Sequence, residues 1–171
     1  MEFDDSAEEA AFRERFRGWL ADHNPGLPTS STDDEYWERQ AEWHCALFDA
    51  GFFALTAPAR YGGHDLPSVY EVILDEELAG AGAPPKPSLG YLIQGMLRHG
   101  SDEICDRFLP GLINGRERWC QGFSEPDAGS DLASLRTRAV RDGDEFVIDG
   151  HKVWTSYSDV ADWCLLLART D

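Results

Sequence analysis

The 171-residue sequence has few cysteines, and they are widely separated. They are Cys45, Cys105, Cys120 and Cys164, and neither a Cys-x-x-Cys pair nor a His-Glu-x-x-His element occurs. This spacing is unlike that of zinc ribbons or of small disulfide-stapled domains, and it favours reduced thiols in the cytoplasm. We therefore expect no metal site, no disulfide scaffold and a cytoplasmic location.

Basic residues and long apolar runs are also scarce. Lysine and arginine number 15 against 32 aspartates and glutamates, which gives a formal net charge of −17. That balance disfavours nucleic acid as a partner, because a phosphate backbone rewards a basic surface. No apolar run reaches the eighteen or so residues of a membrane span, so no span is expected. The first residues, Met-Glu-Phe-Asp-Asp, lack the basic and apolar regions of a secretory signal.

The first two thirds of the chain have the pattern of α-helices. Ser6 is followed three residues later by Glu9, as in a capping box, and apolar residues then recur on one helical face. Similar helix starts occur at Thr32, Ser68 and Ser101. With 42% apolar residues, a chain of this length can bury a core. We predict an all-α helical bundle over residues 1–117.

A different pattern begins at about residue 118. Short segments rich in strand-forming residues are separated by turns of glycine and aspartate; they are residues 136–141, 145–149, 153–157 and 160–168. Such punctuation is typical of antiparallel strands. The predicted fold class is therefore α+β, with the N-terminal all-α helical bundle followed by an incomplete antiparallel β domain over residues 118–171.

Two polar segments in this second part carry the chemical signals. The first is Gly122-Phe123-Ser124-Glu125-Pro126-Asp127-Ala128-Gly129-Ser130-Asp131, and the second is Trp154-Thr155-Ser156. Glycine lets main-chain N–H groups approach a ligand closely, and serine hydroxyls can bind carbonyl or phosphate oxygens. Taken alone, the first segment also fits an ordinary surface turn, since its residues are common turn formers.

Taken together, residues 119–171 resemble the middle region of the acyl-CoA dehydrogenase family. The first segment matches the family pattern of small, aliphatic, Ser/Thr, Glu, two free positions, small, Gly, Ser/Thr and Asp, except that Phe123 replaces the aliphatic residue. Residues 149–156, Asp-Gly-His-Lys-Val-Trp-Thr-Ser, resemble the family's next element. Two motifs at the family spacing are far more specific than a lone glycine pattern. The helical part resembles the family more loosely, through Pro58-Ala59-Arg60-Tyr61-Gly62-Gly63.

The resemblance implies a flavoprotein oxidoreductase that uses FAD. Such an enzyme oxidises an acyl-CoA thioester between its α and β carbons and passes a hydride to the flavin. By resemblance, the residues that bind the flavin are Gln121, Gly122, Phe123, Ser124, Trp154, Thr155 and Ser156. Ser130 resembles a position that contacts the acyl-CoA substrate. Glu125 is interpreted as structural, because the family's catalytic base lies elsewhere.

In this family the base comes from a C-terminal helical domain, which is absent from these 171 residues. The chain is therefore expected to be the N-terminal portion of the enzyme, without a catalytic residue of its own. The resemblance also implies an electron-transfer flavoprotein as electron acceptor, and a homo- or hetero-oligomer, either a dimer or a tetramer. Two alternatives stay open. One is an acyl-CoA oxidase or flavin monooxygenase relative on the same fold, and the other is a non-catalytic partner subunit of a heteromeric dehydrogenase.

Overall fold

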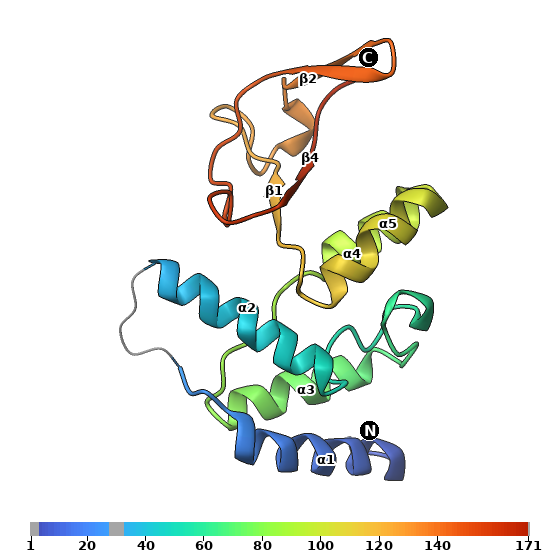
Figure 1. The fold of residues 1–171 in the computed structure, drawn as a ribbon, viewed down its shortest axis with the longest axis vertical. Helices are drawn as coiled ribbons and strands as arrows, with labels where there is room; N and C mark the ends of the chain where they lie inside the picture. The colour runs from blue at the N-terminus through green and yellow to red at the C-terminus, as the bar shows by residue number, and fades with distance from the viewer. Residues whose placement is uncertain (1–3, 28–32, 171) are drawn as a thin grey trace. The chain divides into compact units, whose positions relative to one another are not determined.

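The computed structural model describes residues 4–27 and 33–170. The chain divides into two compact units, Met1–Arg116 and Glu117–Asp171, called here the helical unit and the β unit. Among the described residues, five α-helices precede four short strands (Figure 1). The predicted α+β class, with helices first and a partial β domain after them, is confirmed. None of the described helices is long and apolar enough to cross a membrane.

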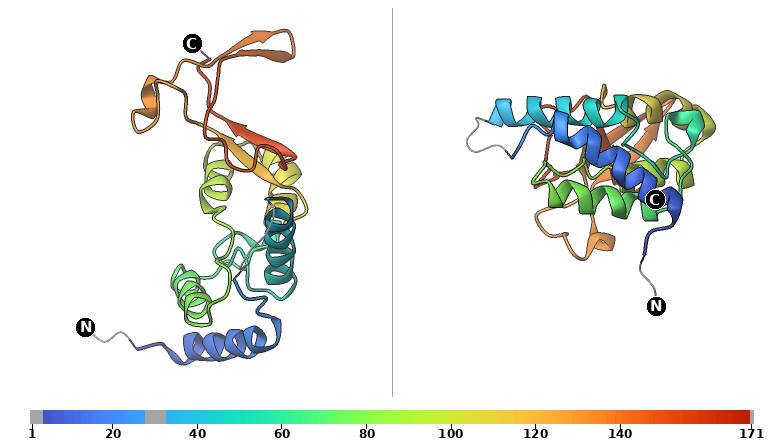
Figure 2. Two further views of the ribbon diagram at one scale, coloured as in Figure 1. Left: turned by 90° about the vertical axis from the view of Figure 1, so that its left-hand side faces the viewer. Right: turned by 90° about the horizontal axis from the view of Figure 1, so that it is seen from below.

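The helical unit is built from α1 (Ala7–His23), α2 (Asp33–Asp49), α3 (Val69–Gly80), α4 (Gly90–His99) and α5 (Asp102–Ile113), with a short 3-10 turn, η1 (Ala59–Tyr61). Helices α1 and α3 lie side by side (Figures 1 and 2). Two arginines of α1 join them, because Arg13 lies 2.7 Å and Arg17 2.6 Å from carboxylate oxygens of Glu77 in α3.

Aromatic side chains fill the core of the helical unit. Phe12 and Phe16 of α1, Trp43 of α2 and Phe52 of the following loop are each at most 3% exposed. The rings of Phe16 and Phe52 have centroids 4.7 Å apart. Full burial of one such side chain contributes about 1.5–3 kcal/mol, so this cluster is a main source of stability for the unit.

Three of the predicted helix starts, at Ser6, Ser68 and Ser101, are confirmed, and two of the three carry a side-chain cap. The Ser6 hydroxyl accepts a hydrogen bond from the Glu9 N–H at 3.3 Å, and the Glu9 carboxylate accepts one from the Ser6 N–H at 2.7 Å. Ser101 caps α5 through its hydroxyl. Ser68 precedes α3 without a side-chain cap, because its own backbone is already helical (φ −60°, ψ −19°), whereas a capping residue is extended. Thr32 lies outside the described residues.

The β unit contains β1 (Trp119–Gly122), β2 (Arg138–Asp142), β3 (Glu145–Asp149) and β4 (Trp163–Leu166), with a 3-10 turn, η2 (Leu132–Ser134). Strands β2 and β3 form an antiparallel hairpin, whereas β1 and β4 pair in parallel. The prediction of antiparallel strands is therefore confirmed for one pair and wrong for the other. The connection from β1 to β4 is long enough to return the chain to its starting direction, which a short hairpin turn cannot do.

The strand predicted at residues 153–157 is not formed. Residues 153–155 have no regular structure and a turn begins at Ser156; Trp154 has φ 57° and Tyr157 has φ 68°. Both values lie in the left-handed region, which regular strands avoid. Valine, tryptophan and tyrosine favour strands by composition, and that preference misled the prediction. This conformation leaves the Trp154 side chain 89% exposed.

Candidate functional site

The two motif segments meet in the β unit. Ser124 follows β1, and its carbonyl oxygen accepts a hydrogen bond from the Val153 N–H at 2.9 Å. Val153 directly precedes Trp154, Thr155 and Ser156. The fold therefore brings residues 121–124 next to residues 154–156, although 29 intervening peptide bonds separate Ser124 from Val153 in the chain.

A buried ion pair supports this junction. Lys152 Nζ lies 2.8 Å from Glu125 Oε1, and the two side chains are 10% and 7% exposed. The same ammonium donates to the Phe123 carbonyl oxygen at 3.0 Å. The Glu125 carboxylate also accepts from the backbone N–H groups of Arg136, at 2.6 Å, and Thr137, at 2.8 Å. One carboxylate therefore joins three separate segments of the β unit.

These contacts also set the charge of the carboxyl group. The Lys152 ammonium, assisted by the backbone donors, holds the pKa of Glu125 well below its usual range. The group is therefore ionised in neutral and mildly acidic solution, and both of its oxygens are engaged within the fold. A carboxylate in this state is poorly suited to accept a substrate proton, as a general base must. Its hydrogen bonds agree with the interpretation of Glu125 as a structural residue.

Three of the side chains at the junction are available to a ligand. Within the part of the chain that the structure describes, the Trp154 indole and the hydroxyls of Ser124 and Ser156 make no hydrogen bond or ring contact. Trp154 adopts its left-handed φ at a cost of about 1–3 kcal/mol, and such strain concentrates at binding sites. An indole offers a flat apolar face, and a hydroxyl offers both a donor and an acceptor. This combination suits a planar ligand with a polar edge.

Ser130 is exposed on the far part of the same loop. No hydrogen bond joins its side chain to the other described residues. The neighbouring Gly129 has open space where a Cβ would lie, with no atom within 4 Å. The structure therefore does not bring Ser130 into contact with the junction of Ser124 and Val153, and its proposed contact is with a ligand rather than with the protein.

Two glycines make the close packing of the site possible. A Cβ on Gly150 would lie 2.2 Å from the Thr137 hydroxyl oxygen. A Cβ on Gly122 would lie 2.8 Å from a side-chain carbon of Leu166 in β4. Only glycine lets the backbone come this close without displacing its neighbour. Gly150 therefore sets how closely the segment before Lys152 approaches the segment that donates to Glu125.

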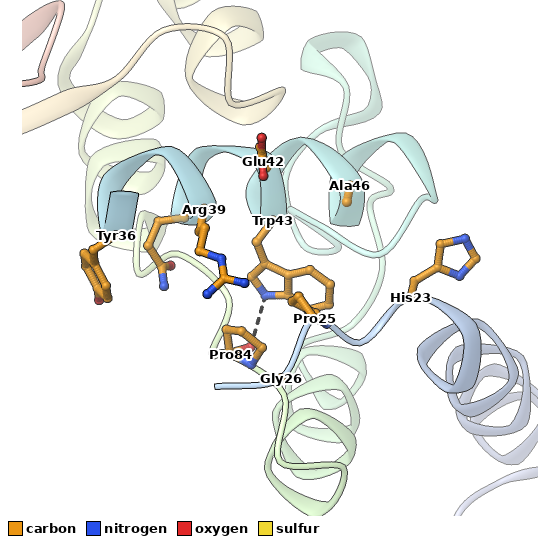
Figure 3. Close-up of a pocket in the computed structure, with 10 residues that line it drawn as sticks. His23, Pro25, Gly26, Tyr36, Arg39, Glu42, Trp43, Ala46 and Pro84 are labelled. Atoms are coloured by element: carbon orange, nitrogen blue, oxygen red, sulfur yellow. Dashed lines mark hydrogen bonds between the residues drawn. The ribbon is translucent and has the colours of Figure 1, made fainter. Parts of the chain in front are cut away.

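A separate cavity of about 230 Å³ is lined by residues of the helical unit (Figure 3). Arg39 and Trp43 extend from α2 toward Pro84, and the Trp43 indole N–H donates to the Pro84 carbonyl oxygen at 3.0 Å. None of the predicted flavin-binding residues lines this cavity. Among the described residues, no group of three His, Cys, Asp or Glu side chains could hold a metal ion.

Family models match both units of the chain. The acyl-CoA dehydrogenase N-terminal domain matches residues 6–116, and the acyl-CoA dehydrogenase middle domain matches residues 120–171. The chain belongs to the acyl-CoA dehydrogenase family. The resemblance drawn from the two motif segments is thereby confirmed.

Individual similar proteins are acyl-CoA dehydrogenases as well. Acyl-CoA dehydrogenase IpdE1 of Mycobacterium tuberculosis is 41% identical over 170 residues, which cover 94% of this chain and 44% of that protein. The mitochondrial isovaleryl-CoA dehydrogenase of Pongo abelii is 29% identical over 171 residues, covering 97% of this chain and 40% of that protein. Among solved structures, the Tcur3481-Tcur3483 steroid ACAD matches with a TM-score of 0.82 and 33% identity, over 100% of this chain and 45% of that one. The chain therefore spans about half the length of the relatives it matches.

Sequence reasoning missed two relationships in the β unit. It gave Lys152 no partner, although the ammonium meets Glu125 and Phe123. The available signal was opposite charge, with a glutamate in the first motif and a lysine in the second. It also treated Cys120 and Cys164 as unrelated, whereas they are opposite each other in the β1–β4 pair. No sequence signal indicates that pairing, because it depends on strand register.

Proposed function

We propose that this chain is the N-terminal portion of an FAD-dependent acyl-CoA dehydrogenase. Residues 1–117 are assigned to the N-terminal helical domain and residues 118–171 to the start of the middle β domain. The reaction is the α,β-dehydrogenation of an acyl-CoA thioester. The observation that carries the proposal is the Ser124–Val153 hydrogen bond, which joins the two motif segments beside an exposed indole and two unengaged hydroxyls.

The residues at the junction fit an isoalloxazine ring. Such a ring has flat apolar faces and an edge of nitrogen and oxygen atoms that need hydrogen-bonding partners. We infer that Trp154 packs on the ring, and that residues 121–124 follow its edge with their backbone N–H groups and the Ser124 hydroxyl. Thr155 and Ser156 belong to the same site on the other segment. When bound, FAD supplies the hydride acceptor.

The chain's own residues bind and orient the reactants. Hydroxyl and N–H donors along the ring edge stabilise the negative charge that builds there as the flavin is reduced, because they are already oriented by the fold. Ser130, exposed on the loop after β1, is inferred to bind the acyl-CoA. Proton abstraction is assigned to a base in the family's C-terminal helical domain rather than to Glu125, whose oxygens are engaged.

Partners are proposed from the relatives. One matched structure, with a TM-score of 0.80 and 33% identity, is the ChsE4-ChsE5 complex from Mycobacterium tuberculosis. Its name gives two different components. The complex supports an oligomer for this protein and favours one second candidate function, a partner subunit of a heteromeric dehydrogenase. An acyl-CoA substrate, an electron-transfer flavoprotein as acceptor and a cytoplasmic location complete the proposal.

The first test is FAD binding by the full-length protein that carries this chain. We expect purified protein to show flavin absorbance, or to take up added FAD, and acyl-CoA to reduce that flavin. Ser156→Ala removes one hydroxyl directed to the ring, so it should slow flavin reduction without changing folding. Ser158→Ala is the matched control, because Ser158 is an exposed serine just past the proposed site.

Each alternative has its own outcome in this experiment. Absence of flavin together with no uptake of added FAD would contradict the proposal and favour the partner subunit. Hydrogen peroxide release that exceeds reduction of an artificial electron acceptor would favour the oxidase. Identical reduction kinetics in Ser156→Ala and wild type would remove Ser156 from the site.

A further inference from the structure

Two cysteines that are far apart in the sequence are direct neighbours in the β unit. Cys120 of β1 is the register partner of Cys164 of β4. Paired residues of adjacent strands are on the same face of a sheet, and the strands are about 4.7–4.9 Å apart. Disulfide-bonded cysteines have Cα atoms about 4.4–6.8 Å apart, so the pairing meets the backbone requirement for a disulfide.

Local packing directs the sulfur of Cys164 toward β1. The position of the missing Cβ of Gly122, which shares a face of β1 with Cys120, lies 3.2 Å from Cys164 Sγ. Burial and the adjacent Cys164 thiol raise the pKa of Cys120 to about 11. Cys120 is 6% exposed, Cys164 is exposed, and both thiols are free. Within these 171 residues, the pair therefore combines one exposed and one buried sulfur.

We propose that Cys120 and Cys164 are a peroxide-sensitive thiol pair that closes into a reversible disulfide. The exposed Cys164 thiolate attacks one oxygen of hydrogen peroxide, which cleaves the O–O bond and leaves a sulfenic acid and hydroxide. The Cys120 sulfur then attacks the sulfenic sulfur and displaces its oxygen as water. Overall, two thiols and one hydrogen peroxide give one disulfide and two waters, and the two electrons lost by the sulfurs reduce the peroxide.

The position of the pair gives the modification a structural consequence. The disulfide would join β1 to β4 at the residue directly before the segment 121–124, which ends at Ser124. Oxidation would therefore restrict the strand that carries this segment, and reduction would release it. The thiol pair depends on the strand register and the two sulfurs, and not on flavin binding.

The remaining cysteines serve as internal controls. The Cys105 thiol is buried and donates to the Met96 carbonyl oxygen at 3.3 Å. The Cys45 thiol donates to the Asn114 carbonyl oxygen at 3.6 Å. Both belong to the helical unit, and we expect both to remain reduced under conditions that oxidise the pair.

The test is peptide mapping of the full-length protein, without reductant, after exposure to dilute hydrogen peroxide. We expect linked peptides containing Cys120 and Cys164, lighter by two hydrogen atoms and separated again by dithiothreitol. The free thiols of these 171 residues should fall from four to two. Cys45→Ser should form the same link, whereas Cys164→Ser should lose it and retain Cys120 as a thiol.

Three results would overturn the proposal: both thiols still free, separate sulfinic acids at the two positions, or a disulfide between two molecules. The map of the wild-type protein decides the question, so a variant that fails to fold does not affect it. A protein that binds no FAD but forms the link would contradict the proposed function and support the thiol pair. A protein that binds FAD but forms no link would support the proposed function and contradict the thiol pair.

Discussion

The Lys152 ammonium lies 2.8 Å from Glu125 Oε1 and 3.0 Å from the Phe123 carbonyl oxygen. The lysine comes from the second motif, and its two partners come from the first. Both charged side chains are nearly withdrawn from solvent, so their attraction is screened less than that of an exposed pair. The pair holds the two segments of the proposed flavin site together.

Replacing Lys152 should therefore disturb both folding and cofactor binding. Lys152→Met leaves the Glu125 carboxylate buried without its cation, which is strongly unfavourable. We expect a lower urea midpoint and weaker FAD binding, measured by tryptophan fluorescence and flavin titration of the full-length protein. Lys152→Arg keeps the positive charge and should retain more of both properties. Equal losses in the two variants would contradict a role for the charge.

Gly150 is predicted to tolerate no side chain. Alanine there would bring a Cβ to 2.2 Å from the Thr137 hydroxyl oxygen and 2.7 Å from the Thr137 Cα, so a rotamer change alone cannot relieve the clash. We expect Gly150→Ala to lower the free energy of unfolding by about 1–3 kcal/mol. Gly129→Ala, where no atom lies within 4 Å, should change it by less than about 0.5 kcal/mol. Similar urea midpoints for the two variants would count against this packing.

His44 should make the helical unit sensitive to acid. Its ring is buried against Phe53, and its Nε2–H donates to the Ile113 carbonyl oxygen at 2.9 Å. Burial lowers the pKa of His44 from 6.5 to about 4, because the charged ring is disfavoured inside the fold. The stabilising contribution of the neutral ring is fully present above pH 6.5 and is lost as the pH falls from 6.5 to about 4. The difference between these two pKa values corresponds to roughly 3 kcal/mol in the free energy of unfolding.

The measurement compares urea unfolding of wild type and His44→Gln at pH 7 and pH 4.5. Glutamine keeps an N–H donor for the Ile113 carbonyl oxygen but does not titrate. We expect the loss of stability on acidification to be smaller in His44→Gln than in wild type. An equal loss in the two proteins would show that His44 does not cause the acid sensitivity.

Trp154 is predicted to serve binding rather than stability. Its φ of 57° suits glycine, and its side chain is 89% exposed. Trp154→Gly should therefore leave the free energy of unfolding unchanged or raise it by up to about 1 kcal/mol, while FAD binding weakens. Trp163→Ala is the control. The ring centroids of Trp163 and Trp119 are 6.1 Å apart, so removing the Trp163 ring should destabilise the β unit. Comparable destabilisation by both substitutions would contradict this assignment.

Local signals accounted for the predictions that succeeded. The Ser6 capping box depends on residues three positions apart, so the sequence contains all of its information. At Ser68 the helix begins as predicted, but the hydroxyl forms no cap hydrogen bond, because the backbone at the cap position is already helical. Residues 153–157 have the composition of a strand, but composition does not indicate the positive φ of Trp154. Propensity is a weak guide wherever tertiary contacts decide the backbone.

The sequence by itself determined the family and the segments that form the proposed site, because each motif is a continuous run of residues. Only the tertiary structure decided that Glu125 pairs with Lys152, that Cys120 is opposite Cys164 and that Trp154 is exposed. These relationships depend on which distant segments meet and in which register. A shift of one residue in strand pairing would move every side chain to the other face, so no local pattern can specify them.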